Sequence, residues 1–492
     1  MKTDPHWERI GRKAHHGIVV PLFALHTKHS SASFSDLLPL IDWCARVGFD
    51  IIQLLPLNDT GNEPSPYYAC SSCALDPVYL SLHALPNAGD LSEIHGATRA
   101  DIKQAKLTWL KRYFAKHWLP KSAEIQAFKA KHTWLLPYAR FKALKEANQN
   151  TAWTTWSDTT PNPDTVDFHC FLQFLAFEQM GAVRDHATKN NVHLLGDVPI
   201  LLNPDSADVW AEPELFDRTL SAGAPPDIYN PLGQNWGFPL FRWDVLRQQN
   251  YRWWKRRLDV AASLYHLYRI DHVVGFFRIW AIEDGKAPSV GQFVPSDPTV
   301  WLSQGRELLE MMIRSSPLLP IAEDLGTIPK GVSHVLEELG ICSTKVFLWQ
   351  VRKSGKRSVI PYGSYDPVSL TTVSTPDGDP LAVMWRDAPE LGQAFATFKG
   401  WEYNPVLTQI QRLALLYDAH HTASLFHINP LQEYLNLFPE LSWPNPEDDR
   451  INVPGVVLPT NWTYQFRPSV EEIAAHPGLA GAIARIIGKS TA

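Results

Sequence analysis

The segment from Leu264 to Phe277 reads Leu-Tyr-His-Leu-Tyr-Arg-Ile-Asp-His-Val-Val-Gly-Phe-Phe. Its aliphatic and aromatic front half is typical of a buried strand, and it ends on Arg269 and Asp271, shortly before Gly275. Residues two apart on a strand face the same way, so the two charges are expected to point together. The guanidinium would hold the carboxylate ionised, which makes Asp271 a candidate nucleophile. The alternative is a structural ion pair that closes one end of a barrel.

Seven further β-like runs lie on either side of this stretch, and helical patterns separate most of them. The first two enclose apolar residues at helical spacing, which predicts a βαβ unit with parallel strands. In total, eight runs alternating with helices predict an α/β fold, a (β/α)8 TIM barrel that forms one catalytic domain over residues 1–492. The seven runs are residues 17–25, 49–55, 192–199, 318–325, 344–351, 370–375 and 424–428.

Large insertions are expected after the second and other strands. Residues 58–191 begin with a Pro-rich loop and continue with helical patterns over 101–118, 123–148 and 168–190, which predicts a mostly helical subdomain. Residues 222–239 are rich in Pro and Gly and are interpreted as a loop. A single helix over residues 240–262 is expected to lead from there to the fourth strand.

Composition excludes several classes of function. The net charge of -6 and the pI near 6.3 argue against a nucleic-acid partner. No run is long and apolar enough to cross a membrane, and the first residues lack the apolar core of a signal peptide, so a cytoplasmic location is expected. Cys70 and Cys73 have no second pair to complete a zinc site, and no His-Glu-x-x-His occurs. Neither a metal nor a cofactor is indicated.

Acidic residues close four of the predicted strands. Asp197 ends the third, Asp271 the fourth and Glu323 the fifth, while Asp377 and Asp379 follow the seventh. Barrel active sites lie at the carboxyl ends of the strands, so these acids are expected to converge. A carboxylate cluster among many aromatic residues and without a metal motif suits glycoside chemistry. Asp271 would attack, and Glu323, which follows an apolar run that can raise its pKa, would be the acid/base.

The same residues resemble those of the 4-α-glucanotransferases, the amylomaltase or disproportionating enzymes of the α-amylase-like superfamily. Each short string is weak alone, but their number and order over nearly the whole chain make chance similarity implausible. The run from Phe276 to Trp280 is similar to the branch found in plant cytosolic disproportionating enzymes. The matching strings are Leu54-Leu55-Pro56-Leu57, Ser65-Pro66-Tyr67-Tyr68, Gly196-Asp197-Val198-Pro199, Asp205-Ser206-Ala207-Asp208-Val209-Trp210, Gly223-Ala224-Pro225-Pro226-Asp227, Gly233-Gln234-Asn235-Trp236-Gly237, Arg269-Ile270-Asp271-His272, Ala322-Glu323-Asp324-Leu325-Gly326, Asn452-Val453-Pro454-Gly455 and Asn461-Trp462.

The resemblance implies retaining transfer of an α-1,4-glucan segment between malto-oligosaccharides, or glucans derived from glycogen or starch. It makes Asp271 the nucleophile, Glu323 the acid/base and Asp377 the third acid, which binds sugar hydroxyls in the transition state. It makes residues 222–239 a substrate-covering loop, in which Trp236 either stacks on an acceptor sugar or anchors the loop. The substrate-binding residues it implies are Tyr67, Asp197, Arg269 and His272 at the cleavage point and Asp227, Tyr229, Gln234 and Trp236 in the covering loop.

Two positions depart from the family pattern. Pro376 stands where the family has a His that donates a hydrogen bond to the substrate, and Phe238 replaces a common Asn. Losing one transition-state donor typically costs on the order of a hundredfold in rate, so a slow or altered enzyme is expected. An α-glucan hydrolase and a catalytically weakened glucan-binding protein remain the alternatives.

Overall fold

Eight parallel strands form the centre of the molecule. The computed structural model describes residues 1–28, 32–96, 98–118, 122–226, 231–352 and 357–489. The strands follow the order β10-β11-β12-β1-β2-β3-β6-β9, and a parallel bridge between Ile321 and Cys342 joins the two ends of that order. They are β1 (His15–Val20), β2 (Ile51–Leu54), β3 (His193–Val198), β6 (Leu267–Ile270), β9 (Leu319–Ala322), β10 (Ser343–Val346), β11 (Ser369–Thr372) and β12 (Phe426–Pro430).

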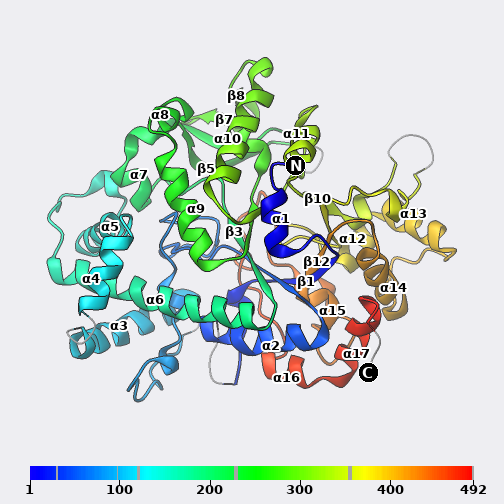
Figure 1. Cartoon of the computed structure of the whole chain (residues 1–492), viewed down its shortest axis with the longest axis horizontal. Coiled ribbons are helices and arrows are strands. Elements are labelled where there is room, and N and C mark those ends of the chain that lie inside the picture. The colour runs from blue at the N-terminus through cyan, green and yellow to red at the C-terminus, as the bar shows by residue number, and fades with distance from the viewer. Residues whose placement is uncertain (29–31, 97, 119–121, 227–230, 353–356, 490–492) are drawn as a thin grey trace.

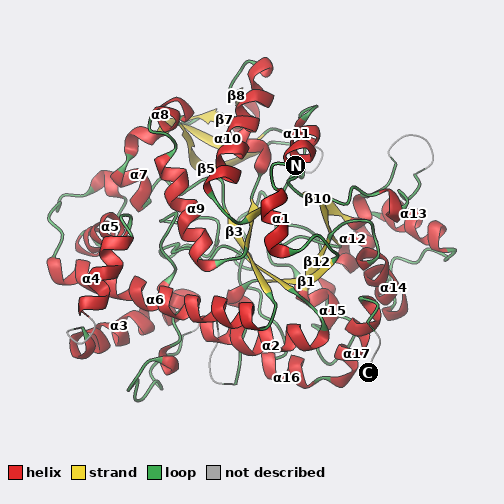
Figure 2. Cartoon of the chain, viewed as in Figure 1, coloured by secondary structure: helices red, strands yellow, loops and turns green. Residues whose placement is uncertain are grey.

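These strands confirm the predicted barrel, and each lies within or overlaps one of the eight predicted runs. The strands are short, and several are apolar because both faces of a barrel strand are covered, although β10 and β11 are mostly polar. All four residues of β2 and of β9 are buried, and Leu267, Tyr268 and Ile270 of β6 are at most 1% exposed. Figure 2 shows the strands at the centre with helices around them.

Helices surround the barrel on all sides in Figure 1. Helix α11 (Val332–Leu339) ends at Gly340, which adopts a left-handed φ of 75°. The helices are α1 (Asp4–Ile10), α2 (Leu37–Val47), α3 (Arg99–His117), α4 (Ser122–Lys131), α5 (Leu135–Ala147), α6 (Pro163–Lys189), α7 (Ala207–Ala211), α8 (Trp243–Gln248), α9 (Arg252–Leu264), α10 (Trp301–Ser315), α11 (Val332–Leu339), α12 (Leu381–Asp387), α13 (Pro389–Lys399), α14 (Gln409–His420), α15 (Leu431–Leu435), α16 (Val470–Ala475) and α17 (Pro477–Ile486).

The long excursion between β2 and β3 contains α3, α4, α5 and α6. The first three lie together at one side of the molecule (Figure 1), whereas α6 also packs against α2 and α9 of the barrel's helical layer. A single helix was expected over residues 123–148, but the chain bends between α4 and α5, at residues 132–134. The excursion is therefore attached to the barrel through α6, which also returns the chain to β3.

A second sheet corrects part of the sequence interpretation. Residues 222–239 were expected to be loop, but β4 (Phe216–Ala224) and β5 (Gln234–Phe241) form an antiparallel pair there. They join β7 (Ile279–Glu283) and β8 (Gln292–Val294) in the order β5-β4-β7-β8. Gly237, at φ 76°, lies within β5, where the pairing register also shifts. The Pro/Gly-rich composition hid these two strands, which pair with each other, and the second partner of β4, strand β7, lies about 60 residues further along the chain.

The helix expected over residues 240–262 is also wrong in its first part. β5 continues to Phe241, α8 follows, and the long helix α9 begins only at Arg252. Asn250 and Tyr251 adopt positive φ between the two helices and so end the first of them.

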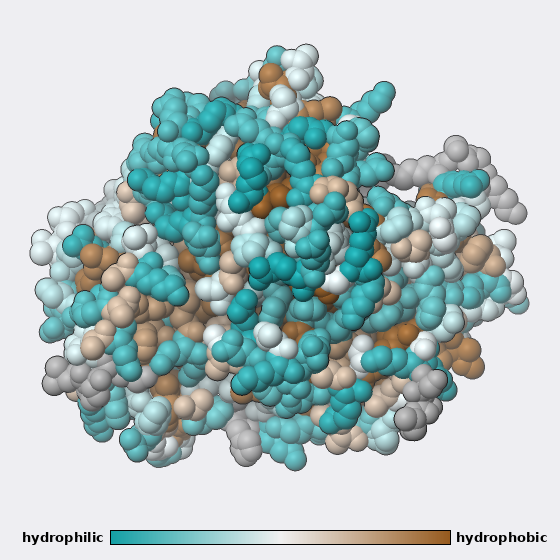
Figure 3. Space-filling view, in the orientation of Figure 1, coloured by the Kyte–Doolittle hydropathy of each residue, from teal (hydrophilic) through white to brown (hydrophobic). Residues whose placement is uncertain are grey.

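Helix α1 covers the amino ends of the barrel strands. It ends five residues before β1 begins, and the ring of its Trp7 lies 5.5 Å from that of Phe426, the first residue of β12. This face is shown in Figure 3, where its surface is mainly hydrophilic and the apolar areas are small and separate. None of the described helices has the length and apolar character needed to cross a membrane.

Candidate active site

The carboxyl ends of neighbouring strands bring the predicted residues together. In the ladder Asp197 of β3 pairs with Arg269 of β6, and Glu323 directly follows β9, the next strand around the barrel. Adjacent strands lie about 4.8 Å apart, so these side chains belong to one site. Asp271 follows β6, and its charge also acts on Glu323 and Asp377. The predicted convergence of the acids is therefore present in the fold.

Arg269 binds two of the acids at the site. Its Nη1 donates to both carboxylate oxygens of Asp197 at 2.8 Å and to Oδ1 of Asp271 at 2.9 Å. Asp197 is 2% exposed in its side chain, whereas Asp271 is 23% exposed. Burial raises the pKa of Asp197 to about 6, and the guanidinium opposes that rise. One cation thus binds a buried carboxylate and orients a second that stays accessible to a ligand.

Glu323 has surroundings that favour its protonated form. Burial raises the pKa of Glu323 to about 7, and the charge of Asp271 adds to the rise, while Arg269 and a backbone hydrogen bond oppose it. That bond comes from the N–H of His272, which donates to Oε2 at 2.9 Å. Near neutral pH this carboxyl is therefore able both to give and to accept a proton, as an acid/base must.

Asp377 lies in the turn that follows β11. Gly378 N–H donates to the carbonyl of Thr375 at 2.9 Å, and Asn452 Nδ2 donates to Oδ1 of Asp377 at 2.7 Å. Burial raises the pKa of Asp377, and the Asn452 hydrogen bond opposes that change. Asp379, two residues on, points to an ion pair with Arg450 instead. The charge of Asp271 also raises the pKa of Asp377, and the charge of Arg269 lowers it.

Tyr67 and His272 also lie at this site. Tyr67 donates its hydroxyl to Oδ2 of Asp197 at 2.8 Å. The ring of Trp236, on β5, meets the His272 ring edge-on with centroids 5.1 Å apart, and Trp236 Nε1 donates to Gln234 Oε1 at 3.1 Å. The antiparallel sheet therefore brings Trp236 against the site. Asp227 and Tyr229 lie outside the described residues.

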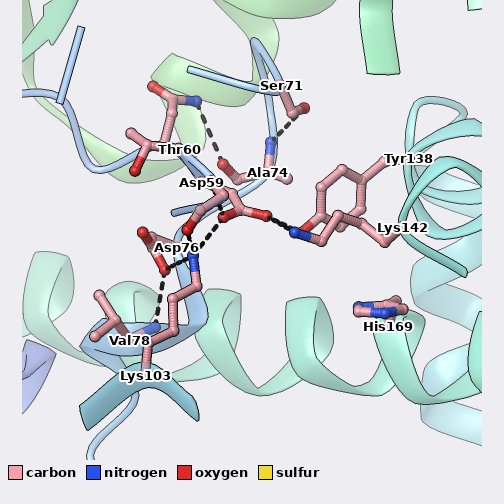
Figure 4. Close-up of polar contacts among 12 residues, drawn as sticks. Asp59, Thr60, Ser71, Ala74, Asp76, Val78, Lys103, Tyr138, Lys142 and His169 are labelled. Carbon is pink, nitrogen blue, oxygen red and sulfur yellow. Dashed lines mark hydrogen bonds and ion pairs between the residues drawn. The ribbon is translucent and has the colours of Figure 1, made fainter. Parts of the chain in front are cut away.

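A buried ion-pair network supports the loop that carries Tyr67 (Figure 4). Asp59, which is 0% exposed, accepts from Lys103 at 2.8 Å, from Tyr138 at 2.7 Å and from the Gly61 N–H at 3.0 Å, and its other ion-pair partner is Lys142 at 2.9 Å. The lysines come from α3 and α5. The helical excursion thus holds the start of this loop on the barrel.

Two residues at the site had no role in the sequence interpretation, although both lie in matched strings. Asn452 contacts Asp377, and the ring of Trp462 lies 5.5 Å from that of Tyr67. Neither has a spacing relation to the acids, so only a resemblance-based search would have marked them. Among the described residues, no group of three or more His, Cys, Asp or Glu side chains is arranged to hold a metal ion.

The protein is a (β/α)8 barrel whose strand ends carry the carboxyl groups that glycosidic-bond chemistry uses. A model of the 4-alpha-glucanotransferase family matches residues 20–471. The chain belongs to the 4-alpha-glucanotransferase family.

The matched relatives cover between 60% and 98% of this chain. The 4-alpha-glucanotransferase of Chlamydia caviae is 40% identical over 98% of this chain and 96% of its own. A rice 4-alpha-glucanotransferase is 34% identical over 60% of this chain and 35% of its own. The amylomaltase of Streptococcus agalactiae, solved in complex with acarbose, has the same fold, with a TM-score of 0.83 at 21% identity over 97% of this chain and 100% of that one.

Proposed function

We propose that this chain is a retaining 4-α-glucanotransferase that moves an α-1,4-glucan segment from a malto-oligosaccharide donor to the 4-hydroxyl of an acceptor sugar. The observation that carries the proposal is the contrast between two neighbouring strand-end acids. Asp271 is exposed to a ligand and bound to Arg269, whereas Glu323 has its pKa raised to about 7 by burial. A nucleophile and an acid/base need this difference.

In the first step Glu323 protonates the glycosidic oxygen while Asp271 attacks the anomeric carbon. The bond between the anomeric carbon and that oxygen breaks, and the cut chain leaves with the proton. Asp377 accepts hydrogen bonds from hydroxyls of the distorted sugar, and Arg269 keeps Asp271 oriented for attack. The product is a glucosyl ester of Asp271.

In the second step Glu323, now ionised, takes the proton of an incoming 4-hydroxyl. The hydroxyl oxygen attacks the anomeric carbon and releases Asp271, so two inversions restore the α configuration. Trp236 lies against His272. Its apolar face can contact the ring of an acceptor sugar and exclude water from the site. Gln234 orients that indole through its hydrogen bond. Asp227 and Tyr229 are assigned to the same acceptor side on the family resemblance.

The alternatives are less favoured. A hydrolase would use the same three acids, and a glucan-binding protein would need none of them, yet relatives matched along the whole chain are named 4-alpha-glucanotransferases. Glucans derived from glycogen or starch are proposed as the longer donors. A cytoplasmic location is proposed on the sequence grounds given above.

The test is the product ladder formed from maltotriose, resolved by chain length. A transferase yields glucose together with chains longer than the substrate, whereas a hydrolase yields only shorter sugars. Asp271→Asn should abolish turnover and leave binding of maltotriose largely intact. Turnover that survives in Asp271→Asn would refute the covalent mechanism.

A further inference from the structure

A loop near the carboxyl end of the chain, residues 450–462, reaches the third acid from a distant part of the sequence. Its first residue, Arg450, forms ion pairs with Asp379 and Glu447. The Trp462 N–H donates to the carbonyl of Ile451 at 2.8 Å, which closes the loop on itself. Asn461 braces the interior, because it accepts from the Val453 N–H at 3.2 Å and donates to the Val456 carbonyl at 2.9 Å. The loop is therefore anchored beside Asp377 and internally bonded.

Within this loop, Asn452 is the residue that forms a hydrogen bond with the carboxyl of Asp377. Its Nδ2 donates to Oδ1 of Asp377 at 2.7 Å across 75 positions of sequence. Elsewhere in the described chain, no side chain or backbone N–H forms a hydrogen bond with this carboxyl. Pro376, its neighbour, has no side-chain donor and no backbone N–H. The orientation of the Asp377 carboxyl thus depends on one amide from another part of the fold.

The same bond acts on ionisation. A hydrogen bond donated to a carboxylate favours the ionised form, and the burial of Asp377 and the charge of Asp271 both work against that form. An ionised carboxylate acts only as an acceptor at both oxygens, whereas protonation turns one oxygen into a donor and weakens it as an acceptor. Asn452 occupies Oδ1 and leaves Oδ2 free to turn toward a sugar.

The other end of the loop contacts the opposite side of the site. Trp462, which adopts the left-handed φ of 63°, places its ring 5.5 Å from the ring of Tyr67. Tyr67 in turn donates to Asp197, the carboxylate bound by Arg269. The loop therefore contacts Asp377 at one end and Tyr67 at the other, and Tyr67 is bonded to the Asp197–Arg269 pair.

We propose that Asn452 is a positioning residue that sets both the orientation and the ionisation of Asp377, and that residues 450–462 are the brace through which it does so. The inference rests on the role proposed above for Asp377 as the third acid. In this role the Asn452 amide takes no part in proton transfer.

The experiment compares Asn452→Ala with the wild-type chain in kcat, KM and the pH profile of kcat/KM on maltotriose. Losing the donor should lower kcat about tenfold to a hundredfold with KM nearly unchanged. The acid limb of the profile should move to higher pH by roughly one unit, because the ionised form of Asp377 loses its support. Asn452→Asp should move that limb further, since a second carboxylate would face the first.

Asn436→Ala is a matched control. Asn436 Nδ2 donates to Oδ2 of Asp449 at 2.6 Å, so the variant removes an Asn-to-carboxylate bond of the same kind that does not involve Asp377. It is expected to change thermal stability and to leave the pH profile alone. If Asn452→Ala fails to fold, Asn452→Gln, which keeps a donor at a shifted position, should show the same acid-limb movement at smaller size.

Three results separate the possibilities. An unchanged kcat and acid limb in a folded Asn452→Ala chain would overturn the inference while the role of Asp377 stands. A raised KM with an unmoved acid limb would also overturn it, because Asn452 would then bind sugar directly. Wild-type turnover in Asp377→Asn would instead overturn the proposed third acid, and the positioning role with it.

Discussion

The backbone N–H of His272 donates to Oε2 of Glu323 at 2.9 Å. This donor belongs to the residue directly after Asp271, and it is aimed by a left-handed φ of 46° at His272. Backbone of this kind in a non-glycine residue is uncommon and concentrates at functional sites. The segment that carries the proposed nucleophile therefore also orients the proposed acid/base on the neighbouring strand.

Activity should fall as pH rises through about 7, because burial raises the pKa of Glu323 to about that value and catalysis begins with its protonated form. The measurement is kcat/KM on maltotriose between pH 5 and pH 9. Glu323→Gln should lose activity by about a hundredfold or more and show no such limb. If kcat/KM of the wild-type enzyme does not fall between pH 7 and pH 9, the assignment of Glu323 is contradicted.

Glu323→Gln should be more stable than the wild-type chain at pH 8. A carboxyl whose folded pKa lies above its unfolded value contributes stability below the unfolded pKa, and that contribution is lost as pH rises through the folded pKa of about 7. The expected gain is roughly 1 to 3 kcal/mol at pH 8, shrinking toward pH 5. Urea unfolding at both pH values tests it. Equal gains at the two pH values would show that ionisation of Glu323 is not the cause.

Pro376→His should raise turnover about tenfold or more, since it restores a donor toward the transition state. Pro376 is buried beside Asp377, so Pro376→Ala is the control that separates release of the backbone from the new side chain. The comparison is kcat for both variants under one set of conditions. No rise in a folded Pro376→His chain would mean that the local backbone differs from the family geometry.

Asp59→Asn should destabilise the chain by about 3 to 5 kcal/mol, because it leaves Lys103 and Lys142 without their shared buried carboxylate. The exposed pair between Arg306 and Glu338 offers the matched control, and Glu338→Gln should cost at most about 1 kcal/mol. Denaturant unfolding of the two variants measures the difference. Equal costs would show that the network in Figure 4 does not hold the excursion in place.

The barrel was readable from the sequence because its signals are local. Apolar runs such as residues 318–325, followed by the helical spacing of Val332 to Leu339, predict a strand and a helix whatever lies elsewhere in the chain. The antiparallel sheet was not readable, because β4 pairs with β7 through contacts such as Leu220 with Glu283. The Pro- and Gly-rich composition of residues 222–239 does not indicate pairing with a strand as distant as β7.

Local patterns in the sequence place acids at the ends of four strands, and the barrel fold brings those strand ends together. The partners that reach these acids from other segments become apparent in the folded chain. Arg269 and Asp271 pair as their spacing predicts, but Asp197 joins them from the neighbouring strand, and the amide of Asn452 comes from 75 positions away to bind Asp377. Such contacts depend on how separate loops pack against one another, and packing between distant segments leaves no period or spacing in the sequence.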